Sequence, residues 1–325
     1  MVSRPATLAL VRSAGCVDVV IPTFDARDLV SACVDRLSDA AIASITVVDD
    51  ASGDGTADAL ADRPAVRVVR LERHRGLAYA LNRGAREGSG RAILFLNNDI
   101  FAPPGAVDRL LAALDANPDA ASAAGRLIDP KTRRTQSSYQ PRSIPGPAAV
   151  IARLTGLERW WPRNPLTGQH LRAPLPEDRP SVTLRQPAGA CLLVRRADHE
   201  AIGGWDEHFS FWYEDVDYAR RLARRGPTVY EPAAAFAHVG RASSARWSKP
   251  DQHRRLYHGT LVYSSLHFGR AGRIVVGSTA AIVASARVGP FTARGDRRAA
   301  ATYREIARQG FGVALSRVPP FPEIR

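Results

Sequence analysis

Short apolar runs alternate with amphipathic segments along the first part of the chain, up to about residue 125. Four of the runs are typical of buried parallel strands: 17–22, which is rich in β-branched residues, 45–48, 66–71 and 92–96. Apolar residues at helical spacing predict a helix after each strand: 29–37, 56–60, 76–85 and 103–114. Thr56 is placed to cap the second helix. The alternation predicts an α/β fold with a mostly parallel, doubly wound sheet flanked by helices.

The second part of the chain is less regular. Residues 131–187 are rich in Pro, Arg and Gln and contain one predicted helix, 148–157, so this excursion is either functional or a tolerated surface insertion. A strand is predicted at 190–194 and a helix at 252–270. The apolar run 274–286 is interrupted by Gly and Ser and is shorter than the ~18 residues of a membrane span. Because arginines flank it, it is either a helix on a membrane surface or an ordinary packed helix.

Polar side chains follow three of the predicted strands, at the point where each strand ends. These clusters lie at 23–25, 49–50 and 97–99. Ligands of parallel sheets bind at the carboxyl ends of the strands, so the three clusters predict a binding site there. No G-x-G-x-x-G follows the first strand and no G-x-x-x-x-G-K-[ST] occurs, which disfavours a classical dinucleotide-binding fold and a P-loop NTPase.

The stretch 211–222 places aromatic and acidic residues ahead of an amphipathic basic helix. Three carboxylates, those of Glu214, Asp215 and Asp217, lie within four positions. Helical spacing puts Asp215 on the first turn, at the edge of the face that the helix buries. An acid there either caps the helix, where the helix dipole favours it, or accepts a proton if it faces a cleft. The stretch alone leaves both interpretations open.

Composition narrows the class of protein. The chain has 325 residues, 45% of them hydrophobic, and a formal net charge of +13. Its two lysines are Lys131 and Lys249, so the positive charge is nearly all arginine, which suits phosphate and carboxylate recognition. No DNA- or RNA-binding signature accompanies the charge, so nucleic acid is not an expected partner. The three cysteines lack pair spacing, which argues against disulfides or zinc and favours a reducing compartment. Residues 1–14 lack the long apolar core of a signal peptide.

An ordered set of motifs in the chain resembles the family 2 inverting glycosyltransferases of the GT-A fold. The resemblance covers about residues 17–240 and is carried, in order, by VVIPTFDA, TVVDDASGDGT, HRGLAYALNRG, LFLNNDI, GACLLVRR and GGWDEHFSFWYEDVD. Within the family the chain is most similar to the bacterial rhamnosyltransferases. That similarity rests on the arginine-rich middle segment, the GACLLVRR strand, and His238-Val239-Gly240 followed by Ser243-Ser244.

The resemblance implies a GT-A fold, which has a Rossmann-like, mostly parallel sheet, here with a C-terminal helical appendage. It divides the chain into a tail (1–16), a GT-A domain (17–240) and a helical region (241–325) that could contact a membrane. Within the GT-A domain, 17–125 is expected to bind the nucleotide and 126–240 the acceptor.

The resemblance also implies a nucleotide-sugar pocket. Its expected residues are Pro22, Thr23, Asp25, Asp49, Asp50, Gly76, Asn82 and Asn98. Asp49 matches the family's usual acidic position and is the stronger candidate for contact with the base. Asp25 and His74 each stand where the family often has Asn. For Gly76 and Asn82, helix packing is an equal alternative.

Metal binding is implied at Asn97-Asn98-Asp99, which resembles the family's D-x-D motif with its last acid retained. Asp99 would bind Mg²⁺ or Mn²⁺, hard cations that take oxygen ligands and bridge to phosphates. His238 lies where related transferases have a metal-binding histidine, although a lone histidine after a strand is often structural.

The resemblance makes Asp215 the general base that deprotonates the acceptor hydroxyl, with Glu214 either orienting it or binding acceptor. Residues expected around the acceptor are Gly189, Trp205, Asp206, Trp212 and Tyr213. The aromatic rings offer flat faces to a sugar, while core packing is the default for at least one of them.

The expected function is metal-dependent, inverting transfer of a sugar, rhamnose from dTDP-rhamnose, to a lipid-linked or polysaccharide acceptor in cell-envelope glycan synthesis. The expected place is the cytoplasm, at the inner face of the plasma membrane. One alternative uses a UDP- or GDP-sugar. Two others come from different classes: a nucleotidyltransferase, and a non-catalytic basic binding protein whose nucleic-acid binding would depend on salt.

Overall fold

The computed structural model describes residues 15–136, 139, 142–161, 164, 179–183, 186–240 and 247–319. Almost all of the predicted tail 1–16 lies outside these residues, as do Ser243 and Ser244 of the rhamnosyltransferase-like segment.

The described strands form one mixed sheet in the order β3-β2-β1-β4-β8-β6-β9-β5, with β7 paired to β9. The strands from β3 to β4 are parallel, which confirms the predicted parallel sheet. The next strand, β8, runs antiparallel to both β4 and β6, and β9 is parallel to β6. The strands are β1 (Val17–Thr23), β2 (Ile42–Asp49), β3 (Val66–Arg70), β4 (Ala92–Leu96), β5 (Ile100–Phe101), β6 (Ser122–Ile128), β7 (Ser181–Thr183), β8 (Cys191–Arg195) and β9 (Thr228–His238).

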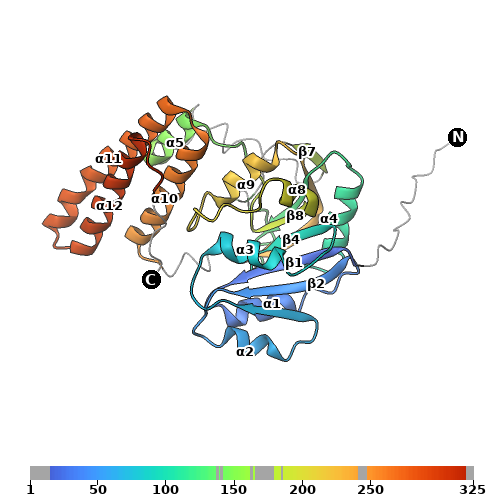
Figure 1. Ribbon diagram of the computed structural model, residues 1–325. Coiled ribbons are helices and arrows are strands. Elements are labelled where there is room, and N and C mark those ends of the chain that lie inside the picture. Colours follow the sequence, from blue (N-terminus) through green and yellow to red (C-terminus); the bar gives the residue numbers. More distant parts are fainter. Residues whose placement is uncertain are drawn as a thin grey trace.

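Helices cover both faces of the sheet, and a group of helices extends from one end of the molecule (Figure 1). They are α1 (Arg27–Val34), α2 (Thr56–Ala61), α3 (Leu77–Ala85), α4 (Ala106–Asp115), α5 (Pro147–Leu154), α6 (Leu157–Trp160), α8 (Arg196–Ala201), α9 (Glu214–Leu222), α10 (Lys249–His267), α11 (Arg270–Ala293) and α12 (Arg297–Ala314).

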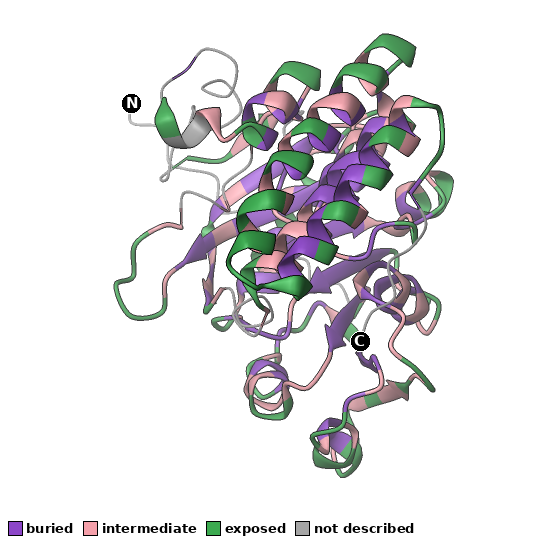
Figure 2. Ribbon diagram, turned by 90° about the vertical axis from the view of Figure 1, so that its left-hand side faces the viewer, coloured by how far each residue is buried: buried purple, intermediate pink, exposed green. Residues whose placement is uncertain are grey.

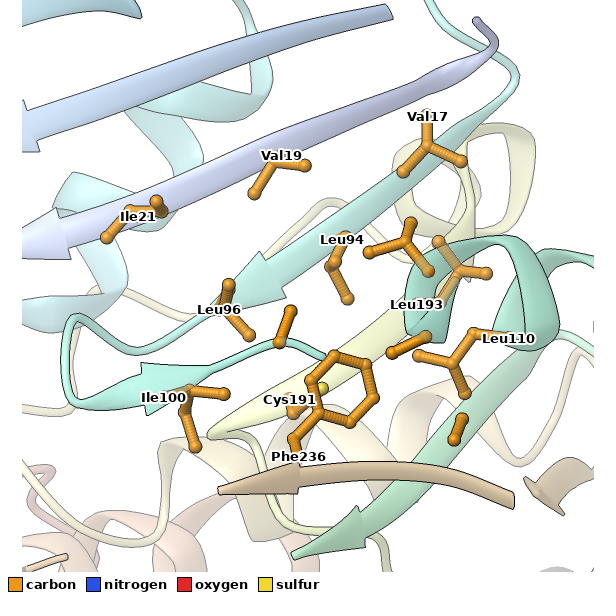
Figure 3. Close-up of a cluster of buried hydrophobic side chains, with 14 of the residues drawn as sticks. Val17, Val19, Ile21, Leu94, Leu96, Ile100, Leu110, Cys191, Leu193 and Phe236 are labelled. Atoms are coloured by element: carbon orange, nitrogen blue, oxygen red, sulfur yellow. The ribbon is translucent and has the colours of Figure 1, made fainter. Parts of the chain in front are cut away.

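Alternation along β1 sends side chains to both faces of the sheet. Val17, Val19 and Ile21 join a core with residues of α1, α2 and α4, part of which is shown in Figure 3. Val20 joins a second core with residues of α3 and α9, among them Tyr218. The sheet is therefore the middle layer of three, as expected for a doubly wound fold.

The C-terminal helices form the predicted helical appendage and share a third core with α5 and the start of α9. Phe209, Tyr213 and Val216 contribute to it from the segment around the start of α9. At the crossing of α11 and α12, a Cβ on Gly277 would lie 2.6 Å from the carbonyl oxygen of Gly310, so only glycine permits this close approach.

One local prediction is wrong, and one helix is longer than the apolar run that marked it. Thr56 does not cap α2, because the N-cap is Gly55 in the left-handed conformation and Asp54 instead accepts the Thr56 N–H at 3.1 Å. The apolar run 274–286 belongs to a longer helix, the 24-residue α11. Among the described residues α11 is the one helix long and apolar enough to cross a membrane by length and composition, and 28% of its most apolar 18-residue window is buried in the protein.

Candidate active site

The ends of β1, β2 and β4 meet at one edge of the sheet, and side chains tie them together. Thr23 and Asp49 are register partners at the ends of β1 and β2, one position beyond Pro22 and its partner Val48. Asn98, just after β4, donates its side-chain N–H to Thr23 Oγ1 at 3.0 Å. The structure thus brings together residues from the three predicted strand-end clusters.

Asp49 is fully buried at this edge. Its Oδ1 accepts the Ser52 N–H at 2.9 Å. Its Oδ2 has no hydrogen-bond partner among the described residues, and the nearest cation, Arg70 Nε, is 3.8 Å away. A buried acceptor without a donor costs about 1–3 kcal/mol, so this oxygen is suited to a ligand that brings an N–H.

Asp50 and Asp25 hold the loops that surround the strand ends. Asp50 accepts the backbone N–H groups of Arg75 at 2.6 Å and Gly76 at 2.8 Å, which fixes the start of α3 against β2. Gly76 has φ +90°, a value that favours glycine. Asp25, with φ +44°, accepts the Gly53 N–H at 2.8 Å and so joins the loops after β1 and β2.

The contacts of Asn82 agree with helix packing, one of the two alternatives that the sequence left open. Its amide exchanges hydrogen bonds with the backbone of Trp205, at 2.8 and 2.9 Å, and donates to Glu207 at 2.9 Å. Together with Trp205 and Asp206 it lines an open hollow of about 1000 Å³ beside α3 and α8, apart from the strand-end carboxylates. Its side chain is therefore committed to holding the 205–207 turn against α3.

Asp99 and His238 lie side by side, because β5 and β9 pair Ile100 with His238. Asp99 is 5% exposed and His238 is 3% exposed, and Asp99 Oδ1 is 3.7 Å from His238 Nε2. Gln136 fixes the histidine: its Nε2 donates to the His238 carbonyl at 2.8 Å, so its Oε1, 2.6 Å from Nδ1, must accept. Nδ1 therefore carries the proton, and the lone pair of Nε2 faces Asp99.

This pair fits a divalent cation. Burial lowers the pKa of His238 despite the opposing effect of Asp99, which keeps the imidazole neutral as a ligand must be. A carboxylate oxygen and an imidazole nitrogen facing each other without a proton between them suit Mn²⁺, or Mg²⁺ through the oxygen. Among the described residues no group of three or more His, Cys, Asp or Glu could hold a metal, so further ligands would come from substrate or water.

Glu214 and Asp215 begin α9, after two successive left-handed residues, Trp212 with φ +64° and Tyr213 with φ +72°. Glu214 is 7% exposed, and its Oε2 has no partner among the described residues. Burial, with the neighbouring Asp215 adding to it, raises the pKa of Glu214 to about 8, so this acid is uncharged at neutral pH. Asp215 is partly exposed.

Asp215 is joined to the strand-end cluster through the segment before β8. Gln186 donates its side-chain N–H to Asp215 Oδ2 at 3.0 Å. A Cβ on Gly189 would lie 2.9 Å from Asp215 Cβ, so a glycine is needed where the backbone runs this close to Asp215. The next residue, Ala190, accepts the Asn97 N–H at 2.8 Å. The carboxylate of α9 is thereby linked to the segment that carries Asn98 and Asp99.

The residues expected around the acceptor have different exposures. Trp205 is 2% exposed and stacks on Tyr218 with 3.9 Å between ring centroids, while Tyr213 is 4% exposed and packs near Tyr263. These two rings are core residues, which is the alternative that the sequence left open. Trp212 is partly exposed and contacts Trp247 edge-on. Asp206 accepts the His208 N–H at 2.9 Å in the turn before α9.

Sequence reasoning missed Gln136 and Gln186, the partners of His238 and Asp215. Both lie within the irregular middle segment, 131–187, where no periodicity marks a residue as buried or oriented. It also missed the role of Asp217, which accepts hydrogen bonds from Arg221 and His267, each at 2.6 Å.

A parallel half-sheet with carboxylates at its strand ends, extended by strands that bring Asp99 to His238, is the architecture of a GT-A glycosyltransferase. Residues 18–202 match the family model described as glycosyl transferase family 2. The chain is 33% identical over 230 residues to N-acetylglucosaminyl-diphospho-decaprenol L-rhamnosyltransferase of Mycobacterium tuberculosis, covering 66% of this chain and 72% of the relative. The chain belongs to glycosyl transferase family 2 and is a glycosyltransferase.

Solved structures agree on the fold. The mannosyltransferase PcManGT from Pyrobaculum calidifontis, in complex with GDP-Man and Mn²⁺, superposes with a TM-score of 0.51 at 16% identity, over 93% of this chain and 87% of that one. GalNAc-T7 with UDP, GalNAc and Mn²⁺ gives a TM-score of 0.53 at 16% identity, over 77% of this chain and 50% of that one. At these identities the likeness establishes the GT-A fold.

Proposed function

We propose that this glycosyltransferase moves rhamnose from dTDP-rhamnose to a lipid-linked or polysaccharide acceptor, with inversion and with a divalent metal, in cell-envelope glycan synthesis. It works on the cytoplasmic side of the plasma membrane. The observation that carries the proposal is the link from Asp215 through Gly189 and Ala190 to Asn97, because it connects the partly exposed Asp215 to the segment bearing Asp99.

Each proposed role follows from a contact. Asp49 Oδ2, which has no donor among the described residues, accepts an N–H of the base. Asp99 and His238 would hold Mg²⁺ or Mn²⁺, which would offset charge on the diphosphate. Asp215, oriented by Gln186, takes the proton of the acceptor hydroxyl.

The balance of the reaction is simple. The acceptor oxygen forms a bond to the anomeric carbon on one face while the bond to the nucleoside diphosphate breaks on the other. The proton ends on Asp215, and the sugar centre is inverted. Glu214, uncharged beside Asp215, adds no second negative charge to repel that of its neighbour.

The choice of sugar rests on relatives rather than on geometry. The mycobacterial relative is a rhamnosyltransferase with a decaprenol-linked, diphosphate-containing acceptor in its name. That relative supports both a deoxy-sugar donor and a lipid-linked acceptor for this chain.

A donor screen tests the proposal. The full chain is incubated with dTDP-rhamnose and a panel of UDP- and GDP-sugars, each with Mg²⁺, with Mn²⁺ and with EDTA. We expect metal-dependent turnover of dTDP-rhamnose, and weaker binding of dTDP in Asp99→Asn only when metal is present. Preference for a UDP- or GDP-sugar contradicts the donor. Pyrophosphate release from a nucleoside triphosphate, without use of any nucleotide sugar, contradicts the whole proposal.

A further inference from the structure

The outward face of α11 is apolar over most of its length. Ile274, Val275 and Ile282 are 39%, 49% and 65% exposed. No charged residue occurs from 274 to 286, a stretch of about 20 Å in a helix. On the opposite side of α11, Val276, Ala280 and Ala284 are buried against the appendage. The helix thus keeps one packed face and one exposed apolar face.

Exposed arginines surround this apolar face. Arg270 and Arg294 lie at the two ends of α11, and Arg304 and Arg308 are exposed on the neighbouring α12. The acids of the hairpin are engaged, since Asp296 caps α12 through the Ala299 N–H at 2.9 Å and Glu305 accepts from Gln309 at 3.0 Å. The hairpin therefore combines apolar surface with net positive charge.

The hairpin is the outermost layer of the molecule, on the side away from the sheet (Figure 1). Seen face on, its outward turns are exposed and its inward turns are buried (Figure 2). Phe311, 53% exposed, and Leu315, 73% exposed, extend the apolar surface onto the end of α12. Two helices thus contribute to a single face, which we call the hairpin face: Ile274, Val275, Ile282, Arg304, Arg308 and Phe311.

The arginines of α12 decide how such a face meets a bilayer. Gly277 and Gly310 pack the two helices so closely that α12 must accompany α11. If α11 crossed the bilayer, Arg304 and Arg308 would enter its hydrocarbon core, where each charge is strongly unfavourable. A helix lying in the interface instead buries apolar side chains below the headgroups and leaves arginines among them.

We infer that the hairpin face docks the enzyme onto an anionic lipid bilayer, with α11 lying in the interface. Positive charge around an apolar stripe is the chemistry that recognises acidic headgroups over acyl chains. The inference rests on the proposed function in one respect: a lipid-linked acceptor requires the enzyme to work at a membrane surface. The binding itself needs no sugar.

Vesicle co-sedimentation of the full chain tests the inference. We expect binding to vesicles that contain phosphatidylglycerol, and at least about tenfold weaker binding to vesicles of phosphatidylcholine alone. The double variant Val275→Asp/Ile282→Asp should lose binding about tenfold or more. The double variant Arg304→Gln/Arg308→Gln should bind the anionic vesicles about fivefold more weakly for each arginine replaced, and this loss should be smaller at high salt. Val182→Asp is the matched control, because Val182 is 54% exposed but lies on β7.

Two results would overturn the inference. One is vesicle binding by Val275→Asp/Ile282→Asp equal to that of Val182→Asp. The other is a wild-type dimer that the double variant converts to a monomer without any lipid binding, which would make the hairpin face a subunit interface. Transfer to a water-soluble, short-chain acceptor is measured in parallel. It should be unchanged in the double variant, and its absence from the wild type would count against the proposed function instead.

Discussion

Glu214 and Asp215 follow one another at the start of α9, yet their carboxylates have different surroundings. Glu214 points into the protein, where burial raises its pKa to about 8. Asp215 is partly exposed, next to Gly189 and Gln186. At neutral pH the pair therefore carries one charge less than the sequence suggests, and the exposed member is the one available to an acceptor hydroxyl.

Asp215→Asn should lower kcat by about 10²–10⁴-fold, because an amide cannot take the acceptor proton. Glu214→Gln should retain most activity near pH 7, since it replaces an uncharged acid by an amide of similar shape. Both variants should bind dTDP like the wild type. Steady-state kinetics and nucleotide titration measure these effects. Full transfer activity in a folded Asp215→Asn protein would show that another group is the base.

Glu214 should also make stability depend on pH. Its pKa is raised in the folded state, so between about pH 4.5 and 8 the folded protein holds a proton that the unfolded chain releases. Its contribution is complete below the unfolded pKa and is lost as pH rises towards 8. Across that interval the free energy of unfolding of the wild type should therefore fall, relative to that of Glu214→Gln, by up to roughly 1.4 kcal/mol for each pH unit.

Urea denaturation of both proteins across the interval measures the difference. A difference that stays constant with pH would mean that Glu214 titrates normally in the folded state.

Much of the residue-level site could be predicted, because polar residues at strand ends must lie at the same edge. The hydrogen-bond partners of those residues could not be predicted, because Asp25 and Asp50 accept from backbone N–H groups of loops that lie 25 to 28 positions away in sequence. The sequence left Asn82 open between nucleotide contact and helix packing, because only its position within α3, from which its amide bonds the Trp205 carbonyl, decides where it points. Nothing in the sequence marks Gln186 as the partner of Asp215.

At the scale of elements, α9 is fixed to its surroundings by Asp217. This residue is 1% exposed and bonds both Arg221 and His267, the last residue of α10. Arg221 in turn donates to the carbonyls of Ile202 at 2.8 Å and Gly204 at 2.6 Å. One carboxylate thus joins α9 to the appendage and to the turn after α8.

Asp217→Asn should destabilise the fold by about 3–5 kcal/mol, because it leaves the largely buried Arg221 guanidinium without its counter-charge. Burial raises the pKa of Asp217, but hydrogen bonds from His267 and Arg221 outweigh this effect and hold the pKa below its usual range. The contribution of Asp217 to stability is therefore present above its unfolded pKa and is lost as pH falls through its folded pKa. The difference in the free energy of unfolding between wild type and Asp217→Asn should thus become smaller in acid.

Asp115→Asn is the matched control, since Asp115 pairs with Arg91 at an exposed site, where an ion pair contributes about 0–1 kcal/mol. Chemical denaturation compares the two variants. Equal losses would mean that the Asp217 contacts contribute no more than a surface pair.

Strands that form continuous apolar runs were the elements most readily predicted, and all four parallel strands are confirmed. The strand β6 was missed because it begins with the small residues Ser-Ala-Ala-Gly and has an arginine before its two large apolar residues. Its Gly125 is required by packing: a Cβ there would lie 2.4 Å from the Ala234 carbonyl oxygen. Contact with β9 therefore determines β6, and no local pattern reports such a contact.

Two glycines of α11 should respond differently to the same substitution. Gly277→Ala forces a Cβ against the backbone of α12 and should destabilise the protein by about 1–3 kcal/mol. Gly289→Ala meets nothing within 4 Å among the described residues beyond its chain neighbours and should change stability by less than about 1 kcal/mol, because the gain in helix propensity opposes the contact of the new Cβ with Pro290. Thermal denaturation measures both. A stabilising Gly277→Ala would show that the two helices are not packed this closely.

At the scale of the whole molecule, the appendage and the catalytic domain share a core. Phe209, Tyr213 and Val216 belong to the catalytic half, yet they pack with Tyr263 and Ile306 of the appendage. The contact continues into the backbone, because a Cβ on Gly259 would lie 2.3 Å from the Trp212 carbonyl oxygen. The predicted boundary near residue 240 therefore divides the sequence without dividing the hydrophobic core.

A shared core predicts that the full chain unfolds in one transition, because losing the appendage would expose the residues that position α9. A ligand that binds the strand-end site should then stabilise the appendage as well. With dTDP and Mn²⁺ at 100 times the dissociation constant, the gain should be about 2.7 kcal/mol, seen as an upward shift of the whole transition.

Calorimetry and hydrogen exchange together make this measurement. When dTDP and Mn²⁺ are added, backbone amides should exchange more slowly in α10 and α12 as well as around Asp49 and Asp99. Asp99→Asn should reduce the shift with metal present and leave it unaltered in EDTA. The alternative outcome is two separate unfolding transitions, of which only one shifts to higher temperature with dTDP. That result would mean that the helical region folds independently and that α10 does not couple it to α9.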